Sequence, residues 1–299
     1  MKFKYLIIAF SILIVLFLLT TALLPMFVPS SVYAANLRNV ASPLLFFISA
    51  ILICLGIYFL INYRLFLLLE REDWPALAYY LEQKIFVKNK FNSRYVKLLA
   101  SSYMVISDYQ SVIKLENNAF LAKRSVVEKN VLIFGAARVI SGDYKGAVTF
   151  FKIHLEKSKL RKQDVEWVHW FYGFSCLLES AFDKAEKEFM FMAVSSKDAI
   201  IAGISAYFLA NNLAGKSLRR LDCLAAAETG RNRVVKALKK IKRWKKEVKK
   251  TETEIHVAII RKYVNEAGKW IFPENSSNQD SSNQDSSNQA SSNQVLEKT

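Results

Sequence analysis

The chain has 299 residues, is 52% hydrophobic and carries a formal net charge of +16, with 42 lysine and arginine residues against 26 acidic residues. Its three cysteines, Cys54, Cys176 and Cys223, are widely spaced, which argues against a disulfide-stapled secreted domain and fits a reducing compartment. The basic excess suits an acidic protein, an anionic lipid surface or a nucleic acid, and does not select among them.

Two uncharged apolar stretches occupy the first part of the chain, at residues 5–28 and 44–61. Each is long enough to cross a bilayer as a helix, and Arg64 would reach the head groups after the second. We expect a short loop at 29–43 between them. Basic residues flank the pair on both outer sides, so residues 1–70 are predicted to form a two-helix anchor in an inner (plasma) membrane, with both termini cytoplasmic.

An alternative concerns the first stretch. The sequence Val32-Tyr33-Ala34 resembles a signal-peptidase site, and cleavage after Ala34 would remove that stretch. The stretch is longer than the apolar core of a usual signal peptide, which is about 7–15 residues. In either case the second stretch ends in the cytoplasm. A further alternative is a pair of buried helices in a soluble protein, although uncharged stretches of this length are difficult to bury.

An aromatic residue follows a short turn at positions 74, 109, 144 and 182, in steps of 35, 35 and 38 residues. A period in this range is typical of stacked supersecondary units. From Glu72 to Gly230 the apolar residues recur at helical spacing, without the alternation of strands. We therefore expect residues 71–230 to form an all-α solenoid of helical hairpins.

The clearest unit spans residues 131–155. Gly135 lies in its first helix, Gly142-Asp143-Tyr144 forms the turn, and Ala147 and Phe151 lie in the second helix. A small residue in one helix allows close approach of the next. This pattern predicts a tightly packed helical hairpin.

A second unit repeats this pattern 38 residues later, with Gly173, Ala185 and Phe189. A weaker unit precedes the two, Asp73-Trp74 begins a lone second helix, and a degenerate pair is expected at 199–212 and 218–228. The units resemble tetratricopeptide repeats, over about half of the chain. The family's helix-ending proline and early tryptophan are absent, so related helical-hairpin repeats remain an alternative.

The tetratricopeptide resemblance implies a concave groove, lined by the first helices, that binds a protein segment. By register, the lining positions are Arg94, Lys97, Ser101, Met104, Lys129, Leu132, Ala136, Val139, Trp167, Trp170, Phe174 and Leu177. The candidate partner-binding residues among them are Arg94, Lys97, Lys129, Trp167, Trp170 and Phe174. The groove would be basic at one end and aromatic at the other. Alternatively, the aromatic residues pack inside the superhelix. Ser101 stands where a carboxylate-binding subtype has asparagine, which argues against such a clamp.

Residues 231–272 are predicted to form a basic amphipathic helix. Between 231 and 250, eleven lysine or arginine residues accompany one acid, Glu247, and an apolar stripe includes Trp244. This helix could cap the solenoid, contact an anionic leaflet or bind a nucleic acid; the last is least favoured because no nucleic-acid-binding fold pattern is present. The candidate residues for an anionic surface are Lys239, Lys240, Lys242, Arg243, Lys245 and Lys246.

The remaining segments carry no motif for catalysis. Residues 273–299 repeat Ser-Ser-Asn-Gln, and we expect a disordered low-complexity tail. Gly215-Lys216-Ser217 resembles the end of a phosphate-binding loop, but position 210 is alanine where the motif needs glycine. The histidines lack metal-ligand spacing. We therefore expect no enzyme activity, no metal and no cofactor.

The sequence thus predicts a membrane-anchored scaffold that binds a protein through a cytosolic groove. The second hypothesis is binding of a membrane surface or nucleic acid by residues 231–250. A third is an assembly factor in cofactor biogenesis, because two spans followed by repeats also resemble the HemY-type proteins linked to haem synthesis. The identity of the partner, the pathway and the oligomeric state do not follow from the sequence.

Overall fold

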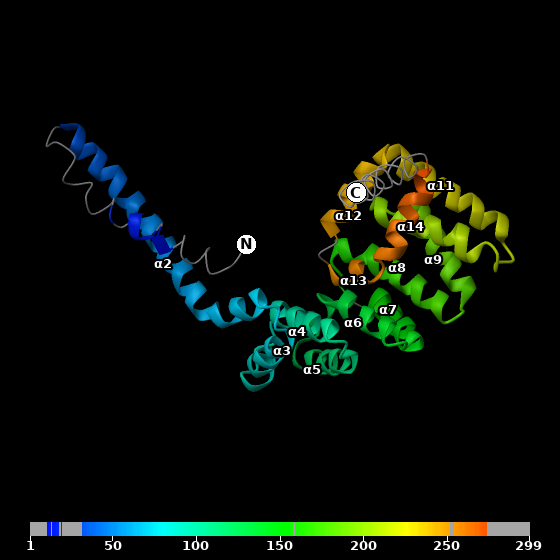
Figure 1. The fold of residues 1–299 in the computed structure, drawn as a ribbon, viewed down its shortest axis with the longest axis horizontal. Coiled ribbons are helices and arrows are strands. Elements are labelled where there is room, and N and C mark those ends of the chain that lie inside the picture. The colour runs from blue at the N-terminus through cyan, green and yellow to red at the C-terminus, as the bar shows by residue number, and fades with distance from the viewer. Residues whose placement is uncertain are drawn as a thin grey trace, which may run out of the picture. The chain divides into compact units, whose positions relative to one another are not determined.

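The computed structural model describes residues 11–12, 14–17, 19, 32–157, 159–251 and 254–273. Every regular element in these residues is a helix, and none of them forms a strand (Figure 1). The chain divides into two compact units, Met1–Lys88 and Asn89–Thr299, which we term the N-terminal and C-terminal units. The all-α prediction is confirmed for the described part of the chain. The predicted tail lies, after its first residue Pro273, outside the described residues.

The N-terminal unit contains the long helix α2 (Val32–Glu70), the helix α3 (Trp74–Glu82) and a π-helical turn η1 (Gln83–Val87). By length and composition, Phe46–Glu70 could cross a membrane, and it is the one such helix among the described residues. The other predicted span, 5–28, lies largely outside them.

The predicted loop at 29–43 is wrong from Val32 onward, because these residues form the first turns of α2. Alanine and leucine are frequent here and favour a helix. Pro43 removes only one hydrogen bond of the backbone and does not stop the helix.

The last turns of α2 pack against α3. Leu65 of α2 and Leu77 of α3 are buried. The guanidinium of Arg64 lies 5.4 Å from the ring centroid of Tyr80, where it makes a cation–π contact. The second helix that begins at Trp74 is therefore not alone, as the sequence predicted, but completes a hairpin with the end of the apolar helix.

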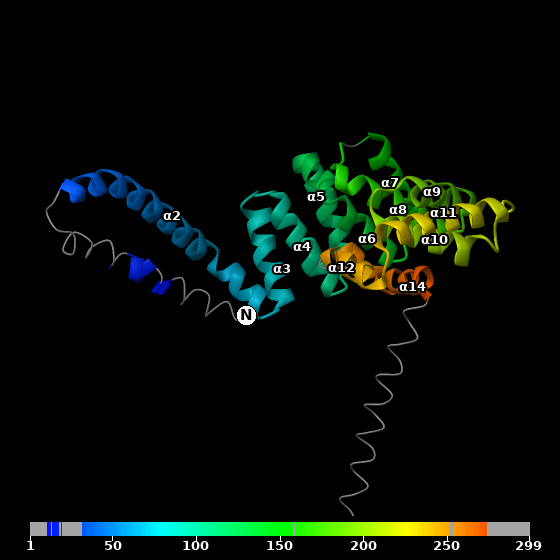
Figure 2. The same cartoon turned by 90° about the horizontal axis from the view of Figure 1, so that it is seen from above.

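The C-terminal unit is built from four helix pairs, in which each helix packs on the next and the first helices of neighbouring pairs also touch. This gives a solenoid-like arrangement (Figure 2). The pairs are α4 (Ser93–Val105) with α5 (Tyr109–Glu128), α6 (Val131–Ile140) with α7 (Tyr144–Lys157), α8 (Lys162–Leu178) with α9 (Phe182–Ser195), and α10 (Ala199–Phe208), extended by the π-helical turn η2 (Leu209–Leu213), with α11 (Arg220–Leu238).

The turns between paired helices share one backbone geometry, which explains the aromatic period. A residue with positive φ ends the first helix, at Glu72 (53°), Ser107 (61°), Gly142 (82°) and Ser180 (61°). The next residue donates its N–H to the carbonyl five positions earlier, at 2.8 to 3.2 Å, which is the Schellman geometry of helix ends. In three turns an aspartate then caps the second helix: Asp73, Asp108 and Asp143.

Small residues allow the close packing that the sequence predicted. A Cβ added to Gly135 would lie 2.0 Å from Cζ of Phe151, and one added to Gly173 would lie 3.0 Å from Cβ of Glu188. Ala147 and Ala185 are fully buried between the helices. The hairpins therefore depend on these positions in the way that the sequence indicated.

The C-terminal segment departs from the single helix predicted for 231–272. Its first residues extend α11, and the rest form α12 (Ile241–Thr251), α13 (Ile255–Ile259) and α14 (Arg261–Ile271). The chain turns after α11 at Lys239, where φ is 63°. Helix α13 then contacts α6, while α14 contacts α10 (Figures 1 and 2). The segment thus folds back onto the face formed by the first helices, which we call the inner face.

Candidate functional site

The aromatic part of the predicted groove is closed by the chain's own C-terminal segment. Trp167, Trp170 and Phe174 are at most 6% exposed. The ring of His256 in α13 lies 5.2 Å from that of Trp167, and the ring of Tyr263 in α14 lies 5.8 Å from that of Phe174, centroid to centroid. The expectation of an open aromatic groove is therefore corrected: these side chains pack inside the superhelix.

Trp244 holds the C-terminal segment in place. This residue, on the apolar side of α12, is 2% exposed. A Cβ added to Gly203 of α10 would lie 2.7 Å from its indole, and one added to Gly268 of α14 would lie 2.5 Å from Nε1. The indole therefore fits between two helices whose backbones approach it closely. Both contacts require glycine.

One part of the inner face remains open, as a cleft of about 350 Å³ that we call the inner-face cleft. Helices α4, α6 and α8 contribute to it, together with residues 250–256. Its charged lining residues are Lys97, Lys129, Arg161, Asp164, Asp198, Lys250 and Glu254. The structure thus brings together two predicted partner-binding lysines, from different repeats, in one site. Arg94 is exposed and lines neither this cleft nor the cleft described below.

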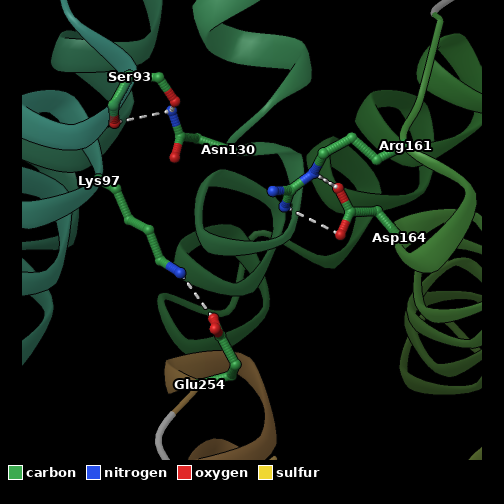
Figure 3. Close-up of polar contacts among 6 residues, drawn as sticks. All are labelled: Ser93, Lys97, Asn130, Arg161, Asp164 and Glu254. Atoms are coloured by element: carbon green, nitrogen blue, oxygen red, sulfur yellow. Dashed lines mark hydrogen bonds and ion pairs between the residues drawn. The ribbon is translucent and has the colours of Figure 1, made fainter.

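Ion pairs order the walls of the inner-face cleft (Figure 3). Nζ of Lys97 lies 2.7 Å from Oε2 of Glu254, and so ties the C-terminal segment to α4. Arg161 donates to both carboxylate oxygens of Asp164, from Nε at 2.5 Å and from Nη2 at 3.0 Å. Lys129 forms no ion pair among the described residues. An anionic group that enters the cleft would therefore meet an unpaired cation.

Burial and charge set the protonation of the cleft. Burial raises the pKa of Glu254, but the hydrogen bond and charge of Lys97 outweigh it and hold that pKa below its ordinary value. Burial lowers the pKa of His256 to about 4. Burial also raises the pKa of Asp198, whose Oδ1 accepts the N–H of Ile200 and caps α10. At neutral pH His256 is therefore uncharged, and Glu254 is ionised.

A second cleft, which we call the lysine cleft, has a volume of about 620 Å³. It is lined by Lys90, Ser93, Lys123, Ser125 and Lys129, among others, so it shares Lys129 with the inner-face cleft. The sequence did not identify Lys90 or Lys123. The backbone of Lys123 leaves the helical region (φ −164°, ψ 93°) inside α5, and the helical periodicity of the sequence carries no sign of this break.

The residues predicted to form an anionic-binding surface are all exposed. Lys239 and Lys240 lie at the turn between α11 and α12, and the remaining four lie on α12: Lys242, Arg243, Lys245 and Lys246. Because Trp244 is buried, α12 turns its apolar side inward and its cations outward. The three-residue His, Cys, Asp or Glu groups that hold metals do not occur among the described residues.

The fold and its clefts define a helical-repeat solenoid protein whose own C-terminal helices fill most of the inner face. A family model described as "Uncharacterised Treponema protein" matches residues 111–273, which are 163 of the 299 residues, and the chain belongs to this family. A protein of Treponema pallidum (strain Nichols), described as "Uncharacterized protein", is 26% identical over 286 residues, which cover 91% of this chain and 88% of that protein. The family match extends from α5 through α14, so it includes the repeats and the helices that cover them.

Proposed function

We propose that the protein is a membrane-tethered docking platform that binds an acidic segment of a partner protein in the inner-face cleft. One observation carries this proposal: the aromatic part of the inner face is closed, whereas its basic end remains open with Lys129 unpaired. The earlier expectation that aromatic anchors bind the partner is replaced by charge recognition. The close helix packing at Gly135 and Gly173 supports assigning the hairpins to the tetratricopeptide type.

Several features of the cleft favour an acidic segment. Lysine and arginine donate charge-assisted hydrogen bonds to carboxylates, which are about twice as strong as neutral ones. Lys97 and Arg161 are already paired with Glu254 and Asp164, which shows the cleft's walls can hold carboxylates at 2.5 to 3.0 Å. A partner carboxylate could bind Lys129 directly, or compete with Glu254 for Lys97. The proposed ligand thus matches groups that the cleft already accommodates.

The membrane tether is proposed from α2. Phe46 to Tyr63 spans 18 residues, or about 27 Å at the helical rise, close to the thickness of the hydrocarbon core. Arg64 and Tyr80 then form a cation–aromatic pair of the kind found at a membrane interface. We further propose that residues 5–28 form a second span in an inner membrane, with both termini cytoplasmic. Tethering raises the local concentration of a bound partner at the membrane.

The docking proposal is tested with the full chain in phosphatidylcholine nanodiscs. A displayed library of peptides graded in Asp and Glu content is selected on the wild type and on Lys129→Glu. Acidic peptides should be enriched on the wild type and lost on Lys129→Glu. The matched control is Lys145→Glu, because Lys145 is exposed on α7 and lines neither cleft. No enrichment by acidity, or equal loss in both variants, would refute the proposal.

A second candidate function is contact of α12 with an anionic membrane surface. The supporting observation is that α12 buries Trp244 and exposes its lysines and arginines. Each such cation near an anionic leaflet contributes about 1 kcal/mol. The test is lysine biotinylation of the full chain in nanodiscs with and without phosphatidylglycerol, at several salt concentrations. Phosphatidylglycerol should protect the α12 lysines; protection by RNA alone would instead favour a nucleic acid.

A further inference from the structure

The lysine cleft has a lining suited to a multiply charged anion. Lys90 comes from the segment before α4, and Lys123 and Lys129 come from the end of α5. Ser93 and Ser125 add hydroxyl groups, and no aspartate or glutamate is found among the described residues that line the cleft. At about 620 Å³ its volume falls within the usual range of small-molecule sites. The lining thus offers donors and positive charge without an internal counter-ion.

These three lysines differ from other basic residues of the solenoid in being unneutralised. In the described part of the chain, none of them lies within ion-pair distance of a carboxylate. By contrast, Arg124, beside the cleft, pairs with Glu128 at 3.2 Å and donates to the carbonyl of Lys157. Three ammonium groups that line one cleft repel one another, and a bound anion would relieve that repulsion.

The backbone assembles the cleft at a specific break. Lys123 and Lys129 are six residues apart, so on an uninterrupted helix their side chains would point about 120° apart. Because α5 leaves the helical conformation at Lys123, both residues line the same cleft. The Asn130 side chain then joins the walls: its Nδ2 donates to Oγ of Ser93 at 3.0 Å and to the carbonyl of Val126 at 2.8 Å. The cleft is therefore held by the fold, beyond being a set of neighbouring surface lysines.

We propose that the lysine cleft binds a phosphate group, carried by a lipid head group or by a small soluble phosphate ester. Lysine ammonium groups bind phosphate as compact point charges, and the serine hydroxyls donate to its remaining oxygens. A phosphate ester carries up to two negative charges, which suits several cations better than one carboxylate does. This site goes beyond the proposed protein-docking function and is separable from it, because Lys90 and Lys123 do not line the inner-face cleft.

The test uses the full chain in phosphatidylcholine nanodiscs, titrated with inorganic pyrophosphate in a calorimeter. Lys90→Gln/Lys123→Gln should weaken binding by at least about tenfold, since a hydrogen bond to a charged group contributes about 1.5 kcal/mol or more. The control, Lys114→Gln/Lys145→Gln, removes the same charge from exposed positions outside the cleft and should bind as the wild type does. Both variants should retain acidic-peptide binding, so failure of this site and failure of the docking proposal are distinguishable.

A lipid arm identifies the source of the phosphate. Native mass spectrometry counts the phosphatidic acid and phosphatidylcholine molecules that stay with the full chain on release from mixed nanodiscs. Selective retention of phosphatidic acid that Lys90→Gln/Lys123→Gln abolishes supports a lipid head group, whereas pyrophosphate binding without such retention supports a soluble ester. Absence of both in the wild type, or an equal loss in the control variant, would overturn the proposal.

Discussion

Replacing Gly268 by alanine should release the C-terminal segment from the inner face. The added Cβ would lie 2.5 Å from Nε1 and 2.8 Å from Cδ1 of Trp244. The indole has no room to retreat, because it is 2% exposed and its other edge meets Gly203. Overpacking of this kind costs about 1–3 kcal/mol. Alanine recovers about 1 kcal/mol through its helix propensity in α14. The expected net loss is about 1–2 kcal/mol.

Hydrogen exchange of the full chain measures this effect in peptides that cover α13 and α14. If the segment detaches locally, a loss of about 1.4 kcal/mol makes its exchange about tenfold faster. Gly215→Ala is the control, because a Cβ there meets no atom within 4 Å. Trp244→Phe removes the indole nitrogen that collides, so in combination with Gly268→Ala its effect should be less than additive. Exchange in Gly268→Ala that matches Gly215→Ala would refute the packing argument.

Three further predictions test the hairpins, the ion pairs and the buried histidine. Gly135→Ala should lower the free energy of unfolding by about 2 kcal/mol, since its Cβ would meet the ring of Phe151 at 2.0 Å; denaturant titration that finds no loss contradicts this. Arg138→Gln should cost about 3 kcal/mol, because its carboxylate partner is 11% exposed, whereas Lys97→Gln, whose pair is about half exposed, should cost below about 1 kcal/mol; equal losses in the same titration would be inconsistent with this ranking. Burial lowers the pKa of His256 from 6.5 to about 4, so the unfolded chain binds this proton more readily. The stability due to neutral His256 is therefore complete above pH 6.5 and falls by up to about 3 kcal/mol as the pH approaches 4, a slope that His256→Leu should reduce in unfolding measured against pH.

Much of the repeat architecture was predictable because its causes are local in the chain. The turn at Gly142-Asp143 needs one residue with positive φ and one capping carboxylate, and both lie within a few positions of the helices that they join. The step of 38 residues that relates Gly135 to Gly173 predicted where helices approach each other closely, and the structure has close contacts at both. Local patterns could not, however, indicate that Val32 begins a long helix, because Pro29 and Pro43 favoured a loop.

The candidate sites were predicted only in part. Lys97 and Lys129 were identified from the register of the repeats, and both line the inner-face cleft. Lys90 and Lys123 were missed, since the lysine cleft depends on a backbone break that hydrophobic periodicity does not reveal.

Sequence reasoning alone established an all-helical chain with an apolar N-terminal region, repeated hairpins and a basic amphipathic segment, because helix periodicity, turn residues and charge are properties of neighbouring residues. The three-dimensional arrangement settled which surfaces are available. Lys97 and Glu254 are 157 residues apart, and Trp244 reaches α10 and α14 across similarly unrelated parts of the chain. Contacts at such separation depend on how complete helices pack, so the covering of Trp167, Trp170 and Phe174 follows from the fold and not from any local pattern.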